Sequence, residues 1–107
     1  MTAALTDDPI LKRFKAALAD MYGDRLSRVV LFGSRARGDA GPDSDYDVAV
    51  FLKSLPDQWN EMKRLADLRV DFLDDTGLFF EAKPFHASAW RDRTPLMHEI
   101  RRDGVDL

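Results

Sequence analysis

Residues 31–50 decide the fold, and they read Leu31-Phe-Gly-Ser-Arg-Ala-Arg-Gly-Asp-Ala-Gly-Pro-Asp-Ser-Asp-Tyr-Asp-Val-Ala-Val50. An apolar strand runs into a Gly33-Ser34 turn, and a polar, glycine-rich segment follows it. Two acids one residue apart then begin a second apolar strand. The stretch therefore predicts two strands joined by a turn and a polar connection.

The two acids are Asp45 and Asp47. Side chains two residues apart in a strand point to the same side, so these carboxylates project together while Tyr46 and Val48 face the other way. Adjacent carboxylates repel each other unless a cation lies between them. Hard oxygen ligands of this kind suit Mg²⁺, which usually binds one or two carboxylates together with substrate phosphates.

The Gly33-Ser34 turn supplies the groups that such a phosphate needs. Glycine lets the backbone approach a ligand closely, and free N–H groups together with the serine hydroxyl can hold phosphate oxygens. A phosphate-binding turn beside a pair of carboxylates is the arrangement that transfer of a nucleotidyl group requires. A plainer interpretation is that the two acids only protect the start of an exposed strand.

Composition narrows the class of protein. The chain has 107 residues, 45% of them hydrophobic, which fits a single domain over residues 1–107. A net charge of −3 argues against direct binding of nucleic acid. The sequence contains no cysteine, no secretory signal and no apolar run of membrane-spanning length. We therefore expect a cytoplasmic protein that does not bind membranes, with a site that a partner or self-association completes.

The rest of the sequence alternates helical and strand patterns. Asp8-Pro9 predicts a helix start and Gly23 its end, while Thr94-Pro95 predicts a last helix through about Asp103. Strands are expected at 28–32, 47–52 and 78–85, a short helix at 34–40, a loop at 41–44 and a long helix from about 55. Residues 69–73 fit either the end of that helix or a short strand.

With these motifs, the chain resembles the minimal nucleotidyltransferase family of the DNA-polymerase-β-like nucleotidyltransferase superfamily. The residues that carry the resemblance are Gly33 and Ser34, the run 36–38, Ser44-Asp45, and Asp47 with the apolar run 48–50. The resemblance implies an α/β (α+β) fold in which a small mixed β-sheet is flanked by helices.

It also implies roles for individual residues. Asp45 and Asp47 would bind two Mg²⁺ ions that bridge the triphosphate of ATP, and Gly33 and Ser34 would hold its β and γ phosphates. A third carboxylate stands on the next core strand of the fold, and the candidate is Glu81, as a metal ligand or a base. Asp71 is the alternative if residues 69–73 form a strand.

Other polar residues near the turn have less specific signals. Arg37, and with a weaker signal Arg35, could clamp phosphate oxygens, or they could form ion pairs with Asp39 or Asp43. Ser44 is a further candidate for nucleotide binding, against the plainer role of supporting the loop. Aromatic residues elsewhere are expected to serve packing: Trp59, Phe79, Phe80 and Trp90.

The resemblance finally suggests a biological role. Short members of the family resemble antitoxins that AMPylate a helical HEPN-type ribonuclease toxin, so we expect a protein adenylyltransferase that uses ATP and Mg²⁺. Two alternatives stay open at this point. One is a binding module that neutralises or scaffolds its partner with weak or no catalysis, and the other is an aminoglycoside nucleotidyltransferase. A homodimer or a hetero-oligomer is compatible with each.

Overall fold

The computed structural model describes residues 8–42 and 44–107, and it confirms the predicted α/β class. Asp43, which falls in the predicted loop, lies outside the described residues. The elements follow in the order α2 (Pro9–Tyr22), η1 (Gly23–Arg25, a 3-10 helix), β1 (Leu26–Phe32), α3 (Gly33–Arg37), β2 (Tyr46–Leu52), α4 (Gln58–Thr76), β3 (Phe80–His86), η2 (Ala87–Arg91, a 3-10 helix), α5 (Pro95–Asp103) and β4 (Val105–Asp106).

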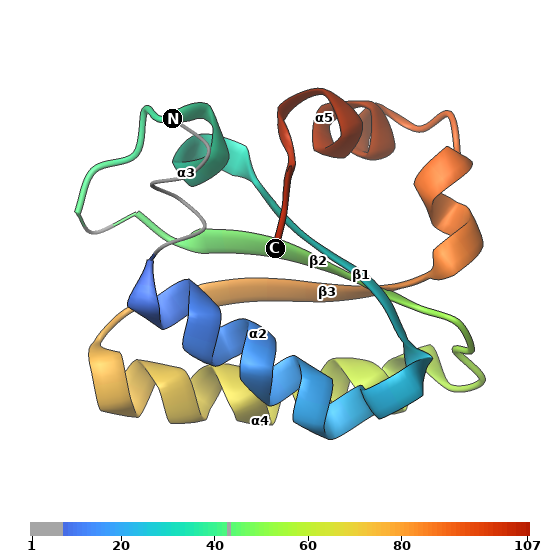
Figure 1. Ribbon diagram of the computed structural model, residues 1–107, viewed down its shortest axis with the longest axis horizontal. Helices are drawn as coiled ribbons and strands as arrows, with labels where there is room; N and C mark the ends of the chain where they lie inside the picture. The colour runs from blue at the N-terminus through green and yellow to red at the C-terminus, as the bar shows by residue number, and fades with distance from the viewer. Residues whose placement is uncertain (1–7, 43) are drawn as a thin grey trace.

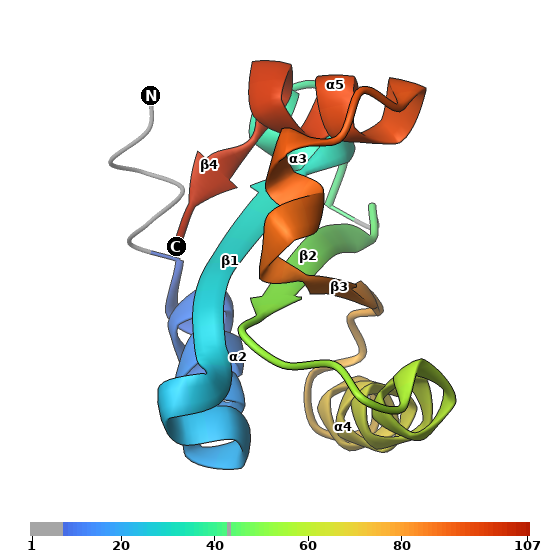
Figure 2. The ribbon, with the colours of Figure 1, turned by 90° about the vertical axis from the view of Figure 1, so that its right-hand side faces the viewer.

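The four strands form one mixed sheet in the order β3-β2-β1-β4. Strand β1 pairs antiparallel with both β2 and β4, whereas β2 and β3 run parallel and are connected through α4. Figure 2 shows β4 as a short strand beside β1. The sequence analysis did not predict β4, because two residues are too few to show an alternating pattern.

Helices cover the two faces of the sheet unequally (Figure 1). Helices α2 and α4 lie along one face, and the shorter α3 and α5 lie on the other. The larger core lies under α2 and α4, where the rings of Phe14 and Tyr46 stack on opposite sides of Phe80 at centroid distances of 4.1 and 4.5 Å. Stacked aromatic rings of this kind bury a large apolar area, so they fix the position of β2 against the helices.

Capping side chains define where the helices begin, as predicted for the first and last of them. The Asp8 carboxylate accepts from the backbone N–H groups of Ile10 and Leu11 and also from the Tyr46 hydroxyl, at 2.8 Å. Thr94 caps α5 by accepting from the N–H of Met97. Satisfying the free N–H groups of a first turn stabilises the helix, and Asp8 additionally ties α2 to β2.

Helix α4 decides the question that the sequence left open at residues 69–73. These residues are helical, since Leu65 and Phe72 of the same helix pack into the core and α4 ends only at Gly77, which adopts a left-handed conformation. The strand alternative is therefore wrong, and Asp71 is an exposed residue of α4. Trp59 was expected to serve packing, but 67% of its surface is exposed, so that prediction is wrong as well.

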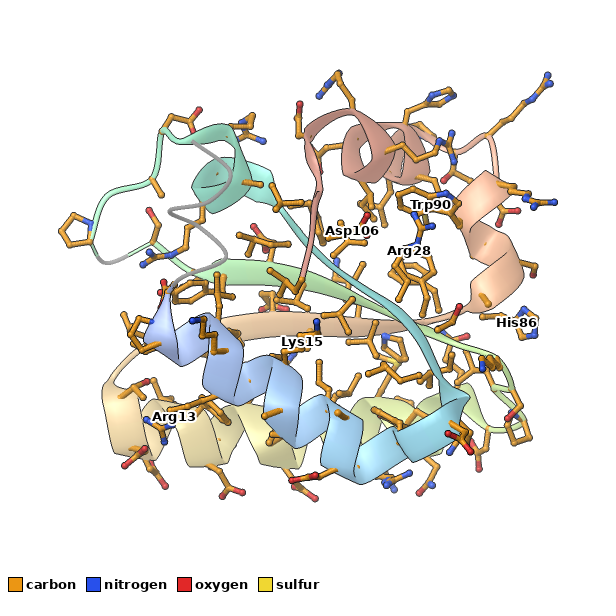
Figure 3. All side chains as sticks on the ribbon, in the orientation of Figure 1. Arg13, Lys15, Arg28, His86, Trp90 and Asp106 are labelled. Carbon is orange, nitrogen blue, oxygen red and sulfur yellow. The ribbon has the colours of Figure 1, made fainter. Side chains whose placement is uncertain are left out.

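The opposite face of the sheet carries a smaller core that α5 and η2 cover. Trp90 packs edge-on against Phe51, and the Arg28 guanidinium lies 3.9 Å from the Trp90 ring centre and 3.9 Å from an Asp106 carboxylate oxygen. Figure 3 shows Arg28, Trp90 and Asp106 gathered beneath α5, with His86 at the edge of the molecule. These contacts fix η2 and β4 to β1. Within the described residues, no helix is both long and apolar enough to cross a membrane.

Candidate active site

Gly33 and Asp47 are in direct contact at the point where β1 ends and β2 begins. Gly33 is buried at the first position of α3 with a φ of +76°. A Cβ atom on Gly33 would lie well under 3.0 Å from Oδ2 of Asp47 and 3.1 Å from its Cγ. Only glycine accommodates both this backbone conformation and this contact. The predicted turn and the predicted acid are therefore neighbours in space.

Strand register places the other acids at the same end of the sheet. Asp47 is paired with Phe32 of β1 on one side and with Glu81 of β3 on the other. Tyr46 and Val48 belong to the core under α2 and α4, so Asp47 faces the side of α3 and α5, as alternation predicted. Glu81 occupies the same level of the parallel neighbour and points to the same face.

Acidic residues of neighbouring segments influence the ionisation of Asp47. Its pKa lies above the ordinary value of an aspartate, because the carboxylate is partly buried and because Asp45, Glu81 and Glu99 add negative charge around it. Lys83 acts in the opposite direction. A cluster of carboxylates that repel one another in a partly buried position favours a bound cation.

The donor set at this end of the sheet fits Mg²⁺. In residues 8–42 and 44–107, no three His, Cys, Asp or Glu side chains come close enough together to hold a metal without further ligands. Mg²⁺ does not require such a set, because it usually binds one or two carboxylates and takes its remaining ligands from phosphates and water. Asp45 and Asp47 can supply the carboxylates, and the turn at Gly33 lies against Asp47.

Glu81 is engaged with α4. Its Oε2 lies 3.5 Å from Nη1 of Arg69, a half-buried pair, and the Arg69 guanidinium also lies 5.4 Å from the centre of the Phe79 ring. The position of Glu81 on β3 brings it near both Arg69 of α4 and Asp47 of β2. Glu81 therefore borders the carboxylate pair while one of its oxygens faces a cation.

Two of the other predicted residues hold the loop before β2. Nε of Arg35 donates to the backbone oxygen of Ser44 at 2.8 Å, and its guanidinium stacks 3.9 Å from the centre of the Tyr46 ring. Oγ of Ser44 accepts from the backbone N–H of Gly41 at 3.0 Å. Among the described residues Arg35 forms no ion pair with Asp39, because its guanidinium stacks on Tyr46 and donates to the backbone oxygens of Pro42 and Ser44.

Ser34 and Arg37 lie on α3 directly behind the turn. Ser34 is half-buried, and its backbone oxygen accepts from the N–H groups of Gly38 and Asp39. Arg37 forms ion pairs with Asp39 at 3.4 Å and with Asp103 at the end of α5 at 3.9 Å. The structure therefore brings Gly33, Ser34 and the three acids to one end of the sheet, whereas Arg37 faces other carboxylates.

Comparison with known proteins agrees with this geometry. The family model described as "Nucleotidyltransferase domain" matches residues 11–97, which is most of the chain. The chain belongs to the nucleotidyltransferase domain family. The matched residues include every predicted site residue of the domain, from Gly33 to Glu81.

Curated relatives come from Methanocaldococcus jannaschii. This nucleotidyltransferase domain is 47% identical over 47 residues to "Putative protein adenylyltransferase MJ0141", a match that covers 44% of this chain and 48% of the relative. It is 37% identical over 70 residues to "Putative protein adenylyltransferase MJ1305", covering 64% of this chain and 48% of the relative. The chain thus spans about half the length of the curated relatives it matches.

Solved structures share the fold. A chain in the crystal structure of a toxin–antitoxin with AMP-PNP superimposes with a TM-score of 0.61 at 18% identity, covering 89% of this chain and 70% of that chain. A chain in a mutant of the toxin–antitoxin MntA-HpeT gives 0.61 at 19% identity, over 90% and 70%. These likenesses confirm the expected nucleotidyltransferase fold with its small sheet flanked by helices.

Two charged residues near Asp47 were not assigned to the site from the sequence. Lys83 stands two positions after Glu81 on β3, so strand alternation places it on the same face, and this signal could have identified it. Glu99 comes from α5, and no local pattern indicates that this helix packs against α3. Long-range contacts of this kind cannot be inferred from the sequence near the motif.

Proposed function

We propose that this domain is a Mg²⁺-dependent adenylyltransferase that moves AMP from ATP to a hydroxyl group of a partner protein. The observation that carries the proposal is the contact between Gly33 and Asp47, because the turn that we assign to the phosphates lies against one of the two proposed metal ligands. The names of the M. jannaschii relatives support the substrate class. AMP-PNP in a structure of the same fold supports a nucleoside triphosphate.

Each residue has a distinct part in this proposal. Asp45 and Asp47 would hold the metal, which would supply neutralisation of the charge on the triphosphate. The backbone N–H groups that begin at Gly33, together with the Ser34 hydroxyl, bind the β and γ phosphates. Arg37, at the end of α3, and Ser44, in the loop before β2, contribute to nucleotide binding by holding the segment between the turn and β2.

The transfer itself is a displacement at the α phosphorus of ATP. The acceptor hydroxyl oxygen forms a bond to the α phosphorus while the bond from that phosphorus to the α–β bridging oxygen breaks. Pyrophosphate leaves with that bridging oxygen, and the hydroxyl proton passes to the carboxylate of Glu81. Catalysis of this kind depends mainly on position and charge stabilisation, which a rigid strand pair supplies.

The partner that fits this proposal is a toxin of the HEPN class, with the present domain as its antitoxin. Toxin–antitoxin complexes among the structures of the same fold support a toxin as partner. ATP as the co-substrate is consistent with the cytoplasmic location that we expect. Both a homodimer and a hetero-oligomer with the partner are compatible with this proposal.

A second function has an observation in its favour. Glu81 is paired with Arg69, and within the described residues the acids do not form a three-ligand metal cluster. If Glu81 stays with Arg69 when nucleotide binds, the domain lacks a base and neutralises its partner by binding alone. The two functions differ in whether AMP becomes covalently attached.

Transfer of label from ATP tests the proposal. The domain is mixed with Mg²⁺, ATP labelled at the α phosphate and the protein encoded beside it, and the proteins are separated under denaturing conditions. We expect label on the partner, loss of label with Asp45→Asn or Asp47→Asn, and unchanged labelling with Asp71→Asn, an exposed acid of α4. Tight complex formation without label would support the binding module instead.

A further inference from the structure

A cleft opens beside the candidate active site along the outer edge of the sheet. It has a volume of about 440 Å³ and lies between α4 and β3, with Leu96 of α5 at one border. Its lining includes Trp59 and Met62 of α4 together with Glu81 and Lys83 of β3. Glu81 is paired in register with Asp47 across β2 and β3, so the cleft adjoins the carboxylate pair.

The chemistry of displacement assigns this side of the site to the acceptor. In a displacement at phosphorus, the attacking and leaving oxygens lie on opposite sides of the reacting atom. The turn at Gly33 follows β1, and the carboxylate pair belongs to β2. If the β and γ phosphates leave toward the turn, the attacking hydroxyl enters from the other side, which is β3 and the cleft.

The walls of the cleft include apolar side chains that the domain leaves in solvent. Trp59 is 67% exposed and Met62 is 47% exposed, and they are separated by nearly one turn of α4. Large exposed apolar residues that border a cleft are typical of a binding surface. Val70 and Leu73 are also exposed on the same helix but do not line the cleft, which makes them internal controls.

Charge in the cleft indicates the chemistry of what binds there. The one lining carboxylate, Glu81, is paired with Arg69. Lys63, which lies 5.7 Å from the centre of the Trp59 ring, and Lys83 form no ion pair with a carboxylate in the part of the chain that the structure describes. These two lysines, beside an apolar wall, complement a segment that carries acidic and apolar residues.

We propose that this cleft is the docking groove for the acceptor, a polypeptide segment of the partner with a hydroxyl-bearing side chain between apolar and acidic residues. Its apolar side chains contact Trp59 and Met62, and its carboxylates face Lys63 and Lys83. Docking there places the hydroxyl next to Glu81. The role of the bound segment as acceptor rests on the proposed function, but docking itself requires neither ATP nor metal.

Titration followed by nuclear magnetic resonance of the isotope-labelled domain tests docking directly. The probes are two capped heptapeptides with a central tyrosine between leucines, one with two flanking glutamates on each side and one with two flanking lysines on each side, added up to about 1 mM, where weak binding is still detected. We expect the glutamate peptide to shift the amide signals of residues 58–66 and 81–85 and the Trp59 indole signal. The lysine peptide should bind at least about 10-fold more weakly.

Variants localise the effect. Met62→Glu places a negative charge in the cleft and should abolish binding of the glutamate peptide, while Val70→Glu, on the same helix outside the cleft, should bind as the unmodified domain does. Equal binding of both peptides, an unchanged affinity of Met62→Glu, or the absence of shifts along the cleft would overturn the proposal. Shifts that depend on domain concentration without peptide would assign the cleft to a second copy and overturn it too.

The same variants separate this inference from the proposed function. If Met62→Glu no longer binds the peptide and no longer transfers AMP to the partner, while ATP and Mg²⁺ still raise its Tm, the docking groove and the transferase function are both supported. If the peptide docks as expected but no protein is ever labelled, the docking groove stands and the transferase function fails. If labelling persists undiminished in Met62→Glu, the transferase function stands and the docking groove fails.

Discussion

Substitution of Gly33 by alanine provides the sharpest perturbation of the site, because one methyl group tests two features of the structure. The backbone at Gly33 has a φ of +76°, a conformation that costs an alanine about 1–2 kcal/mol. The added Cβ atom would also meet the Asp47 carboxylate at well under 3.0 Å, and overpacking of this kind costs typically about 1–3 kcal/mol. The sum predicts a loss of about 2–5 kcal/mol in the free energy of unfolding.

Gly38→Ala is the matched control. Gly38 has a similar φ of +85°, but a Cβ atom there would meet nothing within 4 Å. Gly38→Ala should therefore lose only the conformational part, about 1–2 kcal/mol. The difference between the two variants measures the contact between the turn and the carboxylate.

Denaturation in urea, followed by circular dichroism, gives these free energies without metal or nucleotide. A double-mutant cycle then assigns the difference to Asp47: in an Asp47→Ala background, Gly33→Ala should be no more harmful than Gly38→Ala. Equal losses for Gly33→Ala and Gly38→Ala in the unmodified background would contradict this prediction. They would mean that the carboxylate does not lie against the turn, and the proposed site would lose its main support.

Three further predictions concern charges and caps. Asp47→Asn should raise the free energy of unfolding by about 1 kcal/mol at neutral pH without metal, or the Tm by about 4–8 °C. The reason is that it removes a carboxylate whose pKa is raised by burial and by neighbouring acids. A raised pKa means that the charged form is the destabilised one, so the advantage of Asp47→Asn should shrink as the pH falls through the pKa of Asp47; an advantage that grows on acidification would contradict this sign. Glu61→Gln should lower the free energy of unfolding in urea by about 1–3 kcal/mol, because Glu61 is only 4% exposed and forms ion pairs with Arg25 and Arg64. A loss below about 0.5 kcal/mol would show that the fold does not need this buried charge. Asp8→Ala should lower the Tm by more than Asp57→Ala, since both acids cap helices but Asp8 also accepts from a tyrosine hydroxyl of β2, a bond typically worth about 1 kcal/mol; equal Tm values would remove that second role.

Local sequence patterns predict most of this fold for identifiable reasons. Asp8-Pro9 and Thr94-Pro95 begin their helices where predicted, because a capping side chain and a proline at the first turn act locally. The alternation that separates Tyr46 from Asp47 also appears as predicted, because a strand has a fixed period of two. In each case the determinant and its effect lie within a few residues of each other.

Other features depend on contacts that sequence reasoning does not contain. The end of α4 was ambiguous because residues 69–73 carry both apolar and charged residues, and packing of Phe72 into the core decides the matter. Trp59 is a large apolar residue of a kind that is usually buried, yet it lies on the face of α4 that borders the cleft. The pairing of Glu81 with Arg69 joins β3 to α4.

In the proposed function, Asp45 and Asp47 hold a divalent metal against a triphosphate bound at Gly33 and Ser34. A crystal structure of the domain with AMP-PNP and Mn²⁺, in which anomalous scattering locates the metal, tests it most directly. We expect metal about 2.1 Å from carboxylate oxygens of both Asp45 and Asp47, with the β and γ phosphates on the backbone N–H groups that begin at Gly33. Metal that contacts neither aspartate, or a triphosphate bound away from that turn, would contradict it.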